Sequence, residues 1–155
     1  MKVLLTCLLI CLLLFAYIRL SKVDQSIWHL DPDSITFNNK SNSILLNYNN
    51  KGTEIFNVNI NSLFNHLNNI IINDKCKKVF GDINLGLITY VCRSKVFGFP
   101  DYISIRFEKL DINKSSISIF SRSRFGKYDF GKNKQRIQKW LIELRKIALT
   151  DVENR

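Results

Sequence analysis

Two arginines alternate with two serines in the stretch SRSRFGKYDFGKNKQR, which covers residues 121–136. Arg122 and Arg124 are two positions apart, so in a β-strand their side chains point to the same face of the sheet. The planar guanidinium group of arginine suits carboxylate and phosphate groups, to which it donates two hydrogen bonds at once. The spacing therefore predicts a basic patch on one strand face.

The segment before this stretch supplies a partner strand. Residues 101–110 and 115–123 alternate apolar and polar side chains on either side of the turn sequence DINK, which is typical of a hairpin. Matching apolar with apolar side chains pairs Ile105 with Ile119 and Phe107 with Ile117, and it puts the arginines on the opposite face. The candidate residues for binding an anionic ligand are Arg93, Arg106, Arg122, Arg124 and Tyr102.

Two interpretations of this basic patch remain open. Like charges side by side on a sheet destabilise it unless something compensates them. In the structural interpretation, which we favour, Arg122 and Arg124 pair with Asp101, Asp129 or backbone carbonyls and fix the corner between the last strand and the following helix. In the functional interpretation they bind an anionic group.

The rest of the stretch is typical of such a corner. Glycines can adopt positive φ angles, and Asp or Asn can cap a helix. The predicted structural corner consists of Asp101, Gly126, Asp129, Gly131, Asn133 and Arg136. A second turn is predicted at FGFPD, where we expect Phe97 and Phe99 to pack in the core. The alternative is that these two rings edge a pocket.

Signatures of catalysis are weak. The two histidines, His29 and His66, lie in segments with no predicted contact, and neither a phosphate loop nor a nucleophile elbow is present. Cys76 and Cys92 lack histidine partners, so we expect no metal site and no cofactor. If the turn between their strands centres on Asn84, the two cysteines face each other and can form a disulfide.

The charge is uneven along the chain. The 155 residues carry 23 Lys and Arg against 13 Asp and Glu, a formal net charge of +10. From Arg93 to Lys146 there are fourteen basic and five acidic residues, so the excess belongs to the C-terminal half. A basic half attracts nucleic acid, anionic lipid or an acidic ligand, or it is simply a well-solvated surface.

The N-terminal segment is apolar enough to enter a membrane. No residue from Val3 to Ile18 is charged, and eighteen helical residues span about 27 Å, close to the hydrocarbon thickness of a bilayer. The alternative is a cleaved signal peptide, but AYI and IRL lack the small residues of a cleavage site. We therefore predict an uncleaved anchor over residues 1–20. We place the N-terminus inside and the domain outside, which in a bacterium means the inner membrane and the periplasm.

The remaining pattern predicts one domain. We expect an extended arm over residues 21–54, an α+β domain over 55–149 and a tail over 150–155. The domain order is strand, short helix, four strands and a long C-terminal helix. Short turns between consecutive strands imply an antiparallel sheet of four to five strands, which the helices cover on one face in two layers. This arrangement resembles the TATA-binding-protein-like or helix-grip folds.

Several ordered motifs resemble one family. The chain resembles the proteins of domain of unknown function 1499 in three places. These are Arg93-Ser94, the run from Phe97 to Asp101, and the SRSR stretch with the glycines, Asp, Asn and Arg that follow it. WHLDP after the apolar segment resembles the membrane-anchored proteobacterial branch. The resemblance covers roughly residues 28–144. It implies a fold and a membrane-associated context, and it implies no activity.

These observations favour a non-catalytic envelope domain that binds or scaffolds at the membrane surface. The expected partners are the membrane itself and an anionic lipid or a membrane protein, and nucleic acid is not expected. The alternative is an envelope enzyme that acts on a phosphorylated or acidic substrate with the arginines as a clamp. A third interpretation is a purely structural subunit of a membrane complex.

Overall fold

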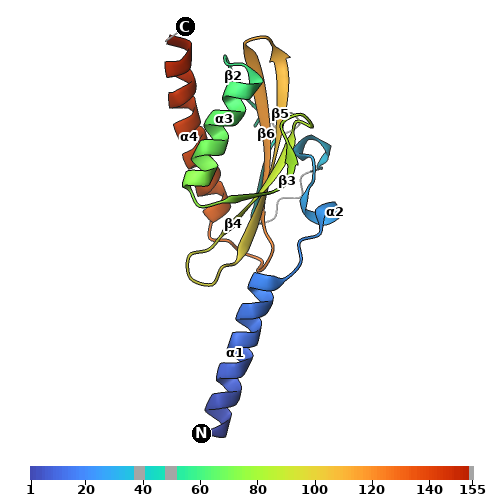
Figure 1. The fold of residues 1–155 in the computed structure, drawn as a ribbon, viewed down its shortest axis with the longest axis vertical. Coiled ribbons are helices and arrows are strands. Elements are labelled where there is room, and N and C mark those ends of the chain that lie inside the picture. Colours follow the sequence, from blue (N-terminus) through green and yellow to red (C-terminus); the bar gives the residue numbers. More distant parts are fainter. Residues whose placement is uncertain (37–40, 48–51, 154–155) are drawn as a thin grey trace.

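The computed structural model describes residues 1–36, 41–47 and 52–153. A long apolar helix, α1 (Lys2–Leu20), projects from one end of a domain that combines a sheet with helices (Figure 1). The α+β class predicted from the sequence is therefore confirmed. None of the residues of α1 is buried. The helix is long and apolar enough to cross a membrane, a property that it shares with signal sequences.

One open antiparallel sheet forms the centre of the domain. Its order is β1-β6-β5-β4-β3, and β2 also pairs with β6. The predicted hairpin register is confirmed, because Ile105 lies opposite Ile119 and Phe107 opposite Ile117. The strands are β1 (Ser43–Leu46), β2 (Glu54–Phe56), β3 (Lys77–Asp82), β4 (Leu87–Arg93), β5 (Pro100–Asp111) and β6 (Lys114–Ser123).

The sheet has six strands, where the sequence predicted four to five. The additional strand β1 lies in the segment that we expected to be an extended arm. Its four residues are too short a run to show an alternating pattern, and they pair with Ile119 to Arg122, far along the chain. Leu45 of this strand is buried.

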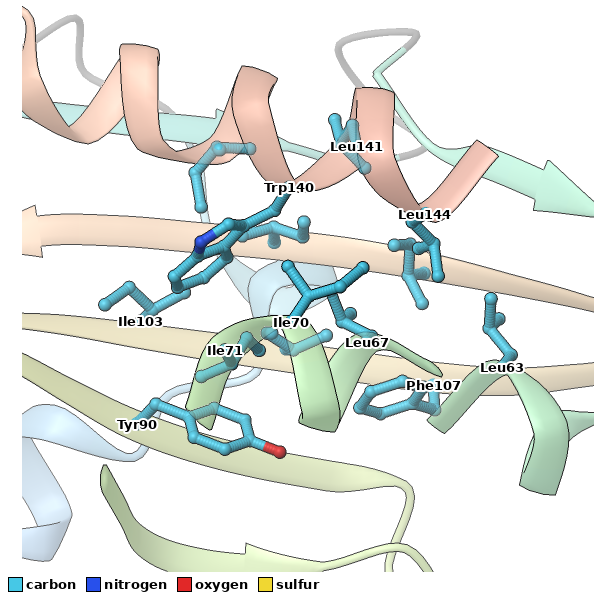
Figure 2. Packing of buried hydrophobic residues seen from close by; sticks show 14 of the residues in the cluster. Leu63, Leu67, Ile70, Ile71, Tyr90, Ile103, Phe107, Trp140, Leu141 and Leu144 are labelled. Carbon is cyan, nitrogen blue, oxygen red and sulfur yellow. The ribbon is translucent and has the colours of Figure 1, made fainter. Parts of the chain in front are cut away.

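Helices α3 (Ile60–Asn73) and α4 (Lys132–Glu153) cover one face of the sheet (Figure 1). Asn59 caps α3 by accepting a hydrogen bond from the backbone N–H of Ser62 at 2.9 Å. Figure 2 shows the apolar side chains of both helices meeting above β5. Trp140 is fully buried there, and its Nε1 donates to Asp74 at the end of α3 at 3.0 Å. Burial of this indole links α4 to both α3 and the sheet.

Cys76, just after α3, and Cys92 in β4 form a disulfide with a Cα–Cα distance of 4.3 Å. The neighbouring pair is Lys77 and Val91, which is the register that a turn centred on Asn84 gives near the cysteines. The covalent bond therefore ties the edge strand β3 to β4 at the end where α3 stops.

Candidate functional site

The N-terminal arm, residues 21–34, crosses the sheet face opposite α3 and α4 (Figure 1). It contains α2 (Gln25–Trp28) and a 3-10 turn, η1 (Pro32–Ser34). Four arginines from β4, β5, β6 and the end of β6 donate hydrogen bonds to this arm or to the last turn of α1. We call them the arginine row: Arg93, Arg106, Arg122 and Arg124.

Arg122 holds the middle of the arm. Its Nη2 donates to the carbonyl of Ile27 at 2.5 Å. Its guanidinium carbon also lies 4.9 Å from the ring centroid of Trp28 and 4.5 Å from that of Phe120. Burial lowers the pKa of Arg122 to about 10, so the group stays charged at neutral pH and interacts with both aromatic faces.

Trp28 is the main apolar contact of the arm. Its ring stacks on Tyr102 with centroids 4.3 Å apart, and Tyr102 is buried beneath it. The carbonyl of Trp28 accepts a hydrogen bond from Ser104 at 3.1 Å. Ser104 is in turn hydrogen-bonded to Thr89, and Thr89 to Nδ1 of His29 at 2.8 Å. A polar chain under the arm thus links it to β4 and β5.

Arg106 fixes the far end of the arm by an ion pair. Its Nε donates to Asp31 at 3.1 Å and its Nη2 to the same carboxylate oxygen, while Nη1 donates to the carbonyl of Leu85. Burial alone would raise the pKa of Asp31, but the hydrogen bonds from Arg106 and from the backbone of Asp33 outweigh it and lower the pKa. The hydrogen bond to Asp31 likewise raises the pKa of Arg106.

The other two arginines act where α1 meets the domain. Nη1 of Arg124 donates to the carbonyl of Lys22 at 3.0 Å. Arg93 donates to the carbonyl of Gly98 at 2.9 Å and to that of Arg19, in the last turn of α1, at 3.5 Å. These contacts fasten the apolar helix to the sheet without a free spacer between them.

The arginine row therefore faces a segment of its own chain. Backbone carbonyls compensate Arg122 and Arg124, as one form of the structural interpretation proposed, but the carbonyls belong to the arm and not to the corner. Among the described residues, Nη1 of Arg122 and the hydroxyl of Tyr102 are buried without a hydrogen-bond partner. The two donors belong to residues that lie opposite each other on β5 and β6.

The predicted corner residues come together on a separate network at the start of α4. Asp101 accepts hydrogen bonds from Ser123 at 2.6 Å and from Arg136 at 2.8 Å. Asn133 is buried, accepts from Ser121 at 2.6 Å and from Arg136 at 2.9 Å, and donates to Ser123. The network holds the first turn of α4 against the ends of β5 and β6.

Asp129 completes this corner. Its two carboxylate oxygens accept from the backbone N–H groups of Gly131 and Asn133, each at 2.9 Å, so it caps the first turn of α4. Gly126 and Gly131 have φ angles of 84° and 74°, which glycine adopts without strain.

The prediction that Phe97 and Phe99 pack in the core is wrong, because both rings are exposed. Gly98, with a φ of 71°, turns the β4–β5 loop beyond the end of the sheet, where neither α3 nor α4 covers it. A Cβ atom built on Gly98 would lie 3.0 Å from Nε of Arg19. The loop thus lies directly beside the last turn of α1.

The sequence did not indicate the arm residues that the arginines bind. Ile27 and Lys22 contribute only backbone carbonyls, which leave no signature in the residue types. Asp31 and Trp28 do leave a signal, since both belong to the WHLDP motif that follows the apolar segment. In the described part of the chain, no three His, Cys, Asp or Glu side chains gather as a metal site requires.

Most of this chain is similar to a known protein family. The family model of the proteins of unknown function DUF1499 matches residues 30–144, which is most of the chain. No curated protein sequence matches it. The matched range includes Asp31 of the arm, all strands of the sheet, the arginine row and the corner at the start of α4. The chain therefore belongs to the DUF1499 family of proteins of unknown function.

Proposed function

We propose that this protein is a membrane-anchored, non-catalytic domain that scaffolds at the membrane surface. The observation that carries the proposal is that the arginine row binds the arm that leads out of α1. Residues suited to an anionic substrate are used instead to hold the domain in a fixed orientation on its anchor. In a bacterium, the anchor lies in the inner membrane and the domain in the periplasm.

The anionic partner in this proposal is the lipid headgroup layer around the anchor. Lys95, Lys127 and Lys132 are exposed, and they belong to the two loops nearest α1 and to the start of α4 (Figure 1). Basic side chains close to an anionic surface contribute about 1 kcal/mol each. A basic end that faces the membrane therefore adds electrostatic attraction to the apolar anchor.

The arrangement gives less support to an arginine-clamp enzyme. A substrate that bound Arg122 would have to displace both the carbonyl of Ile27 and the ring of Trp28. Arg93 donates to the last turn of α1 and Arg124 to the start of the arm, so both guanidinium groups are likewise engaged. We therefore retain the scaffold as the proposed function.

The test is made on the full-length protein expressed in a bacterial host. Membranes are extracted with alkaline carbonate, and the intact mass of the retained protein is measured. We expect the protein in the membrane pellet with a mass that begins at Met1. A mature N-terminus between Ala16 and Asp24, or release of the protein into the carbonate supernatant, contradicts the anchored scaffold.

A further inference from the structure

We infer that two loops of the domain enter the interfacial region of the bilayer that α1 crosses, so that the domain sits against the membrane. The inference rests on the proposed function and adds to it a contact surface. This surface, the interfacial lip, consists of Val96, Phe97, Phe99, Phe125, Tyr128 and Phe130. They belong to the β4–β5 loop and the β6–α4 loop, which lie at the end of the domain where α1 leaves it (Figure 1).

The lip is apolar and largely exposed. Val96 is 72% exposed, Phe97 58%, Tyr128 69% and Phe130 87%. Large apolar side chains that are grouped on a surface mark a contact with a membrane or a partner, whereas isolated ones need no explanation. Here they are interspersed with the exposed side chains of Lys95 and Lys127. Aromatic rings together with basic residues are the composition that membrane interfaces favour.

A continuous row of rings joins the lip to the apolar helix. The centroid of Phe97 lies 5.7 Å from that of Phe99, Phe99 lies 6.1 Å from Phe125, and Phe125 lies 6.2 Å from Tyr17 of α1. Tyr17 is in the last turn of the apolar stretch. Rings that touch it lie at the same height along the helix axis.

The length of α1 fixes that height relative to a bilayer. Its 19 residues span about 28 Å, and the hydrocarbon core of a bilayer is about 30 Å thick. The whole helix is needed to cross, so its last turn lies at the boundary between acyl chains and headgroups. Since Arg93 and Arg124 tie the domain to Arg19 and Lys22, the lip lies at that boundary as well.

Phe130 gives an independent reason to expect a contact outside the protein. Its φ angle is 54°, in the left-handed region that bulky residues avoid, and its ring is the most exposed of the lip. A strained residue with so exposed a side chain gains little folding energy from its ring. A bilayer interface supplies the missing burial.

The test uses the full-length protein in vesicles of phosphatidylcholine with and without phosphatidylglycerol. Phe97→Trp places a fluorescent ring on the lip, and Ile112→Trp places one on the exposed tip of the β5–β6 hairpin at the other end of the domain. Both variants retain Trp28 and Trp140, so the wild-type signal is subtracted. Lipids brominated near the headgroup then quench whichever introduced ring reaches them.

We expect bromolipid to quench the added fluorescence of Phe97→Trp by about twofold, with a blue-shifted emission, and to quench that of Ile112→Trp little. Greater quenching with phosphatidylglycerol identifies an anionic-lipid contribution, and equal quenching identifies an apolar one; both support the lip.

Two outcomes overturn the inference while the proposed function stands. The first is an unquenched indole in Phe97→Trp protein that stays in carbonate-washed membranes. The second is a blue-shifted indole emission in the same variant that bromolipid does not quench, together with a dimer that can be cross-linked. That second result assigns the surface to another copy of the chain.

Release of the protein by carbonate contradicts the proposed function separately. The lip is then judged by the same measurement on the released protein with vesicles added. Quenching of the Phe97→Trp variant in that sample supports a peripheral contact through the lip, and no quenching overturns it.

Discussion

The guanidinium carbon of Arg122 lies 4.9 Å from the centre of the Trp28 ring, so a residue near the end of the last strand holds a residue of the arm that follows α1. The same arginine donates a hydrogen bond to the adjacent Ile27 carbonyl. This one side chain thus couples the arm that leads out of α1 to the middle of the sheet. Removing the Arg122 side chain therefore tests whether the arginine row serves the structure or binds a ligand.

Arg122→Ala is expected to destabilise the protein by about 2–3 kcal/mol, because it removes a charge-assisted hydrogen bond and two cation–π contacts. For a domain of this size, that corresponds to a decrease in Tm of roughly 5–10 °C. Lys114→Ala, at an exposed position of the same strand, is the control. Thermal unfolding in detergent micelles and binding to anionic vesicles are measured together. Unchanged Tm with abolished vesicle binding would assign Arg122 to a ligand instead.

Asn133→Ala is expected to cost about 3 kcal/mol or more. The side chain is buried and serves Ser121, Ser123 and Arg136, so its loss leaves several buried polar groups without a partner. Lys134→Ala, one residue along α4 and exposed, should change stability by less than about 0.5 kcal/mol. Denaturant unfolding of both variants checks the difference. Equal stabilities would show that the corner network contributes little.

Stability should fall on mild acidification because of His29. Burial, and then the charge of Arg106, hold the pKa of His29 below its ordinary value of 6.5. Above that value both the folded and the unfolded chain carry a neutral ring. As the pH falls through this ordinary value, the unfolded chain takes up a proton that the folded chain does not, so stability decreases until the folded pKa is reached, and the loss persists at lower pH.

The check is a comparison of Tm at about pH 7.5 and about pH 5.5 for the wild type and His29→Gln. The variant should lose part of the pH dependence, because glutamine does not titrate in this range. If the Tm of His29→Gln depends on pH as strongly as that of the wild type, another group causes the pH dependence.

Reduction of the Cys76–Cys92 disulfide should lower stability by about 3 kcal/mol, the loss that the chain-entropy model gives for a closed loop of this size. Cys76→Ala with Cys92→Ala should show the same loss and no further response to reductant. The exposed Cys7 and Cys11 of α1 are not part of this disulfide and stay unchanged. Non-reducing mass mapping of protein from the native membrane should find the two domain cysteines linked. Two free thiols there would contradict the bond.

Regular patterns made much of this fold predictable. The alternation of side chains over residues 101–123 determined the register of β5 and β6. The long C-terminal helix was also predicted, and the structure buries Ile137, Trp140 and Leu144 on one face of it. The corner residues also carried recognisable types, since Asp129 caps a helix and Gly131 adopts a positive φ.

Other features had no pattern that the sequence could display. The path of the arm depends on backbone carbonyls of Lys22 and Ile27, and any residue type provides those. Phe97 and Phe99 resembled core residues because an apolar ring next to a glycine looks the same in sequence whether it packs inward or projects outward. Only the position of their loop beside α1 separates the two cases.

The arm also sets an order of events during synthesis. Each of these arm residues binds an arginine that is synthesised much later. Lys22 and Arg124 are 102 residues apart, Ile27 and Arg122 are 95 apart, and Asp31 and Arg106 are 75 apart. The apolar helix and the arm have therefore left the ribosome well before β5 and β6 exist. Contacts between such distant segments form late, after shorter loops have closed. We therefore expect closure of the arm over the finished sheet to be the last step of folding.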